Sequence, residues 1–228
     1  MFVGHLALGL AAKPVTPRVS LAVLIGAAQL ADMLWPVLVA AGVETVRIDP
    51  GNTAFTPLDF VSYPYSHSLA ALILWGVVLG AVYRAITAQN GRTVLVLAAL
   101  VVSHWVLDWI THRPDMPIYP GGPTYGLGLW NSVRMTLVVE GAMWAVGIWI
   151  YMRATRARDG IGRWAFISLI ALLSAFFFGD APSAPPPSVN VLVVSALVAI
   201  VVLTAWSWWA DRHREGILTP TSNKWSQP

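Results

Sequence analysis

Ser103-His104-Trp105-Val106-Leu107-Asp108 lies inside an apolar run that extends from about Thr93 to Thr111. An α-helix places residues four apart on one face, so His104, Asp108 and His112 are expected to share a face. An imidazole and a carboxylate at this spacing form half of a metal site. Ionisable side chains at membrane depth are costly, and they indicate function. The alternative is a His–Asp hydrogen bond that joins two helices.

The composition of the chain is typical of an integral membrane protein. Of its 228 residues, 57% are hydrophobic and only 11% are charged. Several apolar runs approach or exceed the length of about 20 residues that crosses a bilayer. The runs are continuous rather than alternating, which favours helices over a β-barrel. The chain has no cysteine, which excludes thiolate metal ligands. Its basic residues lie beside the apolar runs, so we expect no nucleic-acid partner.

We predict an all-α bundle of about six transmembrane helices within one domain, residues 1–210, followed by a polar and mobile tail, residues 211–228. Phe2 to Ala12 is too short to span a bilayer at about 1.5 Å per residue, so this segment is expected to be a short or re-entrant helix. Pro36 is expected to kink or end the first span. The expected spans are Val19–Ala41, Ser66–Tyr83, Thr93–Thr111, Leu129–Tyr151, Trp164–Phe178 and Val189–Ala210, and the expected irregular loops include Gly42–Tyr65 and Arg113–Gly128.

The basic residues sort to one side of the membrane when the loops are taken alternately. Arg47 and Arg113 fall in loops on the other side. The positive-inside rule places the more basic side in the cytoplasm. We therefore expect a protein of the bacterial inner membrane, with Gly42–Tyr65 and Arg113–Gly128 facing outward. The basic group comprises Lys13, Arg18, Arg84, Arg92, Arg153, Arg156, Arg158, Arg163, Arg212, Arg214 and Lys224.

The ionisable residues of the first half converge on the outer leaflet in this topology. His5 joins the group if the N-terminal segment enters the membrane from the outer side. A desolvated cluster of His and Asp must pair internally or become neutral, and a divalent cation resolves its charge more simply. The expected metal ligands are His5, Asp32, His67, His104, Asp108 and His112.

Each member also has a structural explanation. His5 can be an interfacial histidine, and Asp32 with Gln29 can form a polar contact between helices. Ser66 can cap the helix that follows it. Glu140 with Arg134 can be an ion pair, although six residues is a poor helical spacing for one. The last two spans contain no acidic, basic or His residue, and we expect them to be structural support.

The motifs Gly4-His5, Leu30-Ala31-Asp32, Tyr65-Ser66-His67-Ser68 and Ser103-His104 with Leu107-Asp108 resemble the YdjM-type family of membrane-bound metal-dependent hydrolases. Their order is also similar to that of the zinc phospholipase C and P1-type nuclease superfamily, which cleaves phosphodiesters with three zinc ions. The resemblance covers about the first half of the chain. It implies one zinc held by Asp32, His67, His104 and Asp108, with Asp108 bridging to a second zinc bound by His5.

The chain departs from that superfamily in two places. The region from Met1 to His5 is too different for the superfamily's N-terminal ligand to be carried over. Thr136 stands where a ligand histidine would precede Glu140, so we expect one or two zinc ions rather than three.

The resemblance implies a zinc-dependent hydrolase that cleaves a phosphoester of a lipid or lipid-linked substrate at the outer leaflet. Asp32, Asp108, Glu140 and Arg134 are its candidate catalytic residues, with Arg134 expected to hold a phosphate oxygen. The alternatives are a metal transporter and a membrane protein whose metal only braces its helices.

Overall fold

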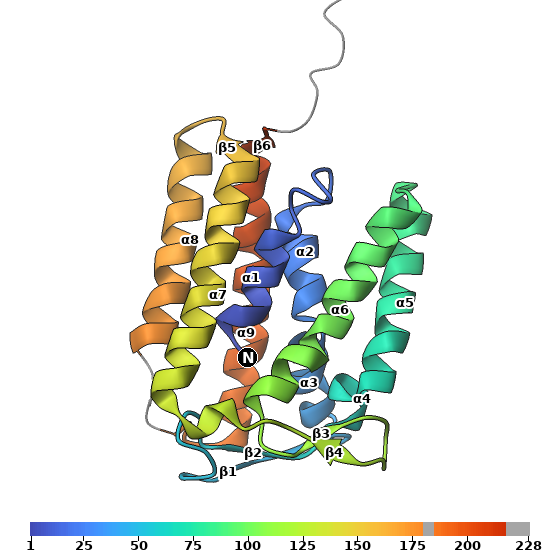
Figure 1. Cartoon of the computed structure of the whole chain (residues 1–228), viewed down its shortest axis with the longest axis vertical. Helices are drawn as coiled ribbons and strands as arrows, with labels where there is room; N and C mark the ends of the chain where they lie inside the picture. The colour runs from blue at the N-terminus through green and yellow to red at the C-terminus, as the bar shows by residue number, and fades with distance from the viewer. Residues whose placement is uncertain (180–184, 218–228) are drawn as a thin grey trace, which may run out of the picture.

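In the part of the chain that the structure describes, five helices are long and apolar enough to cross a membrane, and they form the body of the bundle (Figure 1). The computed structural model describes residues 1–179 and 185–217. Serine or asparagine side chains cap four of the five helices, as is usual where the first backbone N–H groups lack partners. The predicted all-α membrane bundle is confirmed. The five helices are α5 (Leu69–Thr87), α6 (Gly91–Thr111), α7 (Val133–Ala154), α8 (Gly160–Gly179) and α9 (Val189–Arg212).

A sixth apolar segment is broken rather than continuous. Helices α2 (Leu21–Ala28) and α3 (Leu30–Ala40) meet at an angle of 61°. The break lies at Gln29, where φ is −102° and ψ is 11°. Pro36 does not end this span, because it lies inside α3, which continues to Ala40.

Helix α1 (Val3–Ala11) is a half-length helix inside the bundle, and the N-terminus lies near mid-depth (Figure 1). The chain then runs from α1 towards the end of the bundle that contains Lys13 and Arg18. The expected short N-terminal helix is present, but it continues to the end that contains Lys13 and Arg18, opposite the end where the segments after α3 and after α6 lie. Its packing on α7 is close: a Cβ atom on Gly147 would lie 2.6 Å from the carbonyl oxygen of Ala7.

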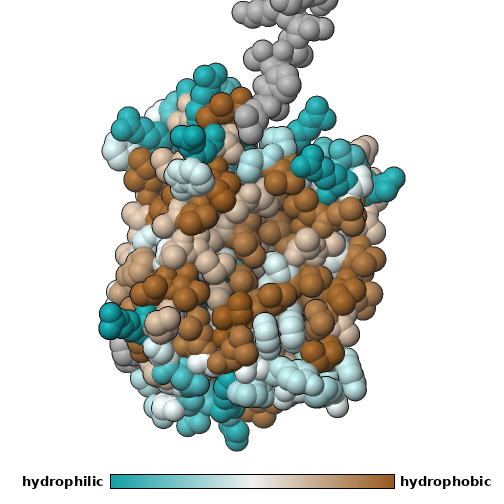
Figure 2. All heavy atoms as spheres, viewed as in Figure 1, coloured by the Kyte–Doolittle hydropathy of each residue, from teal (hydrophilic) through white to brown (hydrophobic). Residues whose placement is uncertain are grey.

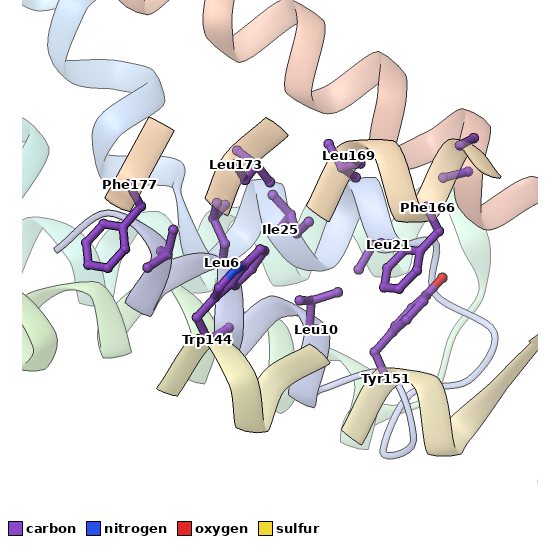
Figure 3. Packing of buried hydrophobic residues seen from close by; sticks show 14 residues of the cluster. Leu6, Leu10, Leu21, Ile25, Trp144, Tyr151, Phe166, Leu169, Leu173 and Phe177 are labelled. Carbon is purple, nitrogen blue, oxygen red and sulfur yellow. The ribbon is translucent and has the colours of Figure 1, made fainter. Parts of the chain in front are cut away.

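The apolar core lies between α1, α2, α7 and α8 (Figure 3). Leu6 and Leu10 of α1 point into it, opposite Phe166 and Leu169 of α8. Lipid tails are as apolar as these side chains, so the core stabilises the bundle mainly through close packing.

Short antiparallel strand pairs lie at both ends of the bundle. The hairpin end carries β1 (Thr45–Ile48) paired with β2 (Leu58–Ser62), β3 (Met116–Pro117) paired with β4 (Thr124–Tyr125), helix α4 (Pro64–His67) and the turn η1 (Leu129–Asn131). The opposite end, the basic end, carries β5 (Thr155–Ala157) paired with β6 (Arg214–Gly216). Figure 2 shows polar residues at both ends and an apolar band between them.

Three segments predicted to be irregular are therefore partly regular. The segment Arg113–Gly128 contains the β3–β4 hairpin. The segment Gly42–Tyr65 contains the β1–β2 hairpin, whose pairing depends on contacts across a long turn. The predicted tail from Asp211 starts later, because α9 reaches Arg212 and β6 pairs with β5. The rest of that predicted tail, residues 218–228, lies outside the described part of the chain.

Candidate metal centre

Asp108 lies at the centre of a buried group of histidines. Its Oδ1 is 3.0 Å from Nε2 of His5, and its Oδ2 is 3.1 Å from Nε2 of His104. Nε2 of His67 and Nε2 of His112 are each 3.8 Å from the same Oδ2. Both carboxylate oxygens of Asp108 therefore face imidazole nitrogens.

Asp32 forms a second corner of the group. Its Oδ1 is 3.5 Å from Nε2 of His67 and 3.7 Å from Nε2 of His104. The side chain of Asp32 is 39% exposed, whereas those of the two histidines are buried. Possible ligand atoms lie within 4.8 Å of one another in two sets, which share His104: His5, His104 and Asp108, and Asp32, His67 and His104.

His104 presents an unprotonated nitrogen to two carboxylates when its ring is neutral. Its Nδ1 lies 2.8 Å from the carbonyl oxygen of Ala28, which only accepts hydrogen bonds, so Nδ1 carries the proton. Its Nε2 is buried and has no good hydrogen-bond partner among the residues that the structure describes. A lone pair facing carboxylates in this way calls for either a proton or a cation between them.

The Nδ1 atoms of His67 and His112 have hydrogen-bond partners as well. Ser66 Oγ donates to Glu44 Oε2 at 2.6 Å and is 2.7 Å from Nδ1 of His67, so it accepts from that imidazole. Nδ1 of His112 lies 3.0 Å from Asp115 Oδ1. Partners of this kind fix the tautomer of metal-binding histidines and leave Nε2 free for the ion.

Four separate elements deliver these side chains. Helix α6 supplies His104 and Asp108 one turn apart, as its spacing predicts, and His112 as its C-terminal cap. Asp32 comes from α3 just after the bend, and His67 ends α4. His5 comes from α1, and its ring stacks on that of His104 with centroids 3.7 Å apart. The structure thus brings together all six predicted metal ligands.

Two predicted catalytic residues, Glu140 and Arg134, are outside the two sets of possible ligands. Glu140 is buried beside the start of α1, where its Oε2 accepts backbone N–H groups of Phe2 at 2.8 Å and Gly4 at 3.2 Å. Its other oxygen, Oε1, has no partner among the described residues. Arg134 is exposed, and no ion pair joins it to Glu140 in the described chain, so the structure does not bring it to the centre.

Thr136, which stands in place of a ligand histidine, turns its hydroxyl to backbone oxygens. It donates to Leu129 at 3.1 Å and to Ser132 at 2.9 Å. The backbone nitrogen of Met1, by contrast, donates to Asp108 Oδ1. No N-terminal ligand was expected to carry over to the region from Met1 to His5, yet the Met1 nitrogen contacts the cluster through Asp108.

Several supporting residues were not predicted. Glu44 and Asp115 orient histidines from the hairpin end, and Tyr63 donates to Asp115 at 2.7 Å. Burial and the neighbouring Asp115 carboxylate raise the pKa of the Tyr63 phenol, which keeps it a donor. Ser68, not Ser66, caps the helix that follows. No sequence spacing relates Glu44 to His67, because the hairpin brings them together.

No protein-family model, curated protein or solved structure matches this chain. The resemblance to the YdjM-type family therefore stays a prediction from the motifs.

Proposed function

We propose that the protein is a membrane-bound, metal-dependent hydrolase that cleaves a phosphoester of a lipid or lipid-linked substrate. The observation that carries this proposal is Asp108, whose two oxygens face histidines from separate elements. Two of those histidines, His67 and His112, are oriented through Nδ1 by residues that make no other contribution to the cluster. Such an arrangement prepares Nε2 atoms for a shared ion.

The spacing of the donor atoms fits a metal better than a hydrogen-bond network. Four of the His–Asp separations lie between 3.5 and 3.8 Å, beyond the usual range for N–H···O bonds of about 2.7–3.2 Å. Two ligands of a tetrahedral zinc ion, each about 2.0–2.1 Å from it, lie about 3.4 Å apart. Asp32, His67, His104 and Asp108 would hold one ion, and His5 with the other oxygen of Asp108 would contribute to a second.

A bound zinc would polarise the phosphoryl oxygens and lower the pKa of a bound water towards neutrality. Asp32 is suited to orient that water and accept its proton, because its side chain is partly exposed. Asp108 is less suited to accept a proton from the water, because its two oxygens already face the Nε2 atoms of His5 and His104. The imidazoles of His67 and His104 are held by their Nδ1 partners and keep the carboxylates in place.

An apolar groove next to Asp32 supports a lipid substrate. It has a volume of about 970 Å³ and follows α9 between α8 and the broken pair α2–α3. Leu172, Phe176, Val194 and Val198 help to line it, while Asp32 and Gln29 provide polar atoms. A hydrocarbon chain in this groove would place its ester group beside the cluster. The last two spans, predicted to be support, would then also bind the substrate.

This proposal includes an orientation. The metal centre lies towards the hairpin end, opposite the basic end, and the positive-inside rule puts the basic end in the cytoplasm. The substrate would therefore be drawn from the outer leaflet of the bacterial cytoplasmic membrane.

The test is metal content and hydrolysis, measured on the same preparations of purified full-length protein in lipid nanodiscs. After zinc reconstitution, wild-type protein should hold one or two zinc ions and hydrolyse phospholipid or phosphodiester probes. Asp108→Asn should lose both properties. Glu215→Gln is the control, because Glu215 is a partly exposed acid at the basic end, away from the metal centre; it should keep both.

Two results would contradict the proposed hydrolase activity. Stoichiometric zinc without hydrolysis of any phosphoester or lipid probe would indicate a metal that only braces helices. Zinc flux into proteoliposomes that Asp108→Asn abolishes, again without hydrolysis, would indicate a transporter.

A further inference from the structure

A second pocket, of about 530 Å³, lies at the basic end, away from the metal centre. Three segments far apart in the sequence wall it: the α1–α2 connection, the strand β5 with its turn, and the chain from the end of α9 through β6. Its lining includes six basic and two acidic residues, which leaves a formal charge of +4. The basic residues are Lys13, Arg18, Arg156, Arg158, Arg212 and Arg214, and the acidic ones are Asp211 and Glu215.

The two acids are already used by internal contacts. Asp211 Oδ2 accepts from Lys13 Nζ at 2.7 Å, and its Oδ1 accepts from Tyr151 at 2.6 Å. Glu215 lies 2.5 Å from Arg156 and 3.7 Å from Arg158. The acids therefore neutralise part of the charge and leave a surplus of cations around the pocket.

Three arginines have no acidic partner among residues 1–179 and 185–217: Arg18, Arg212 and Arg214. The Arg214 guanidinium lies 4.8 Å from the ring centroid of Phe166. It donates to the carbonyl oxygens of Gly162 at 3.0 Å and Thr155 at 3.3 Å and to the Thr155 hydroxyl at 3.1 Å, so it contributes mainly its charge to the pocket. The Arg212 guanidinium lies 4.7 Å from the Trp208 ring. Aromatic faces restrain these two side chains, so less freedom is lost when they bind an anion.

The exposed tryptophans near the pocket indicate that it lies close to the level of lipid headgroups. Exposed Trp149, Trp164 and Trp208 surround this end of the bundle, and each has an arginine over its ring. Tryptophan is enriched at the boundary between hydrocarbon and water. A phosphate at this depth belongs to a lipid of the adjacent leaflet.

We propose that this pocket binds the phosphate group of an anionic phospholipid from the leaflet at the basic end. Guanidinium groups match phosphate oxygens in charge and geometry. Basic pockets between membrane helices are suited to such headgroups. The proposal does not depend on the hydrolase, because it uses none of the residues of the metal centre.

The experiment is native mass spectrometry of the full-length protein released from nanodiscs of phosphatidylglycerol and phosphatidylcholine. Wild-type protein should retain phosphatidylglycerol in preference to phosphatidylcholine. Arg18→Gln combined with Arg212→Gln should weaken that retention by roughly tenfold or more. Both positions are exposed, so the bundle should still form. A parallel titration with inorganic phosphate tests whether a soluble anion is the ligand.

The matched control is Arg84→Gln combined with Arg92→Gln, which removes the same charge from exposed sites outside the pocket. It should leave phosphatidylglycerol retention unchanged. Equal losses in the two double variants, or equal retention of both lipids by wild-type protein, would overturn the proposal. Binding of inorganic phosphate with no retention of phosphatidylglycerol would overturn the assignment to a lipid.

Discussion

The two serines that flank His67 have different partners, one in the candidate metal centre and one at the start of a helix. The Ser66 hydroxyl joins Nδ1 of His67 to Glu44, whereas Ser68 caps α5 by accepting from Ala71 N–H at 3.2 Å. Ser66→Ala removes the partner that orients the imidazole, so zinc affinity should fall by about 10–100-fold. Competition with a chromophoric chelator measures this affinity.

Ser68→Ala is the control for this prediction. It should lower the free energy of unfolding by about 1 kcal/mol and leave zinc affinity within about twofold. If the two variants lose affinity equally, His67 is not positioned through Ser66.

Removing the charge of Asp108 and removing the charge of Glu140 should have different effects on zinc content and turnover. Asp108→Asn should abolish stoichiometric zinc, because both oxygens of Asp108 face ligand histidines. Glu140→Gln retains an oxygen for the N–H groups of Phe2 and Gly4, so zinc content should stay nearly intact while turnover falls. Elemental analysis and initial rates on one preparation measure both. Zinc loss in Glu140→Gln would make Glu140 a ligand instead.

At the residue scale, the sequence predicts the candidate metal ligands better than the residues that orient those ligands. The four-residue spacing on α6 predicts the contact of His104 with Asp108, because helical geometry is local. Glu44 and Asp115 reach the histidines through hairpins whose pairing is not encoded in any short pattern. Arg134 was misjudged for a related reason: six residues place it on a different face of α7 from Glu140.

The close packing of α1 on α7 gives a prediction about a whole element. A methyl group on Gly147 would meet the backbone of Ala7 at 2.6–2.7 Å, so Gly147→Ala should force the helices apart. We expect a loss of about 1–3 kcal/mol in unfolding free energy. Because α1 carries His5, zinc affinity should fall as well. Thermal unfolding in detergent and chelator competition measure the two effects.

Gly160→Ala provides the comparison, since a Cβ there would meet nothing within 4 Å. That variant should unfold and bind zinc as the wild-type protein does. A Gly147→Ala protein with unchanged stability and affinity would mean that α1 can shift along α7 without disturbing His5.

The positions of the long helices follow from the apolar runs, but the bend in the first span does not. The sequence suggested Pro36 as the break, since proline removes a backbone donor. The observed break at Gln29 lies next to Ala28, whose carbonyl accepts from His104. A contact with a residue 76 positions away has no local signal.

The whole molecule is polarised, with the metal centre near one end and the surplus arginines at the other. Cysteines introduced at Thr124 and Gly160 should therefore be labelled from opposite sides of the membrane. Both positions are exposed, and the native chain has no cysteine to interfere. In intact cells, an impermeant maleimide should label Thr124→Cys only. Labelling of Gly160→Cys alone would reverse the orientation.

The position of α1 has a consequence for biosynthesis. Phe2 is synthesised early, yet its N–H binds a carboxylate 138 residues further along the chain. At about 5–20 residues per second, the ribosome needs roughly 7–28 s to reach that partner. During that interval the half-length α1 has no α7 to pack against. The contact between Phe2 and Glu140 can therefore form only after α7 has entered the membrane, and until then the start of α1 is held only by elements that precede α7, such as α2 and α6.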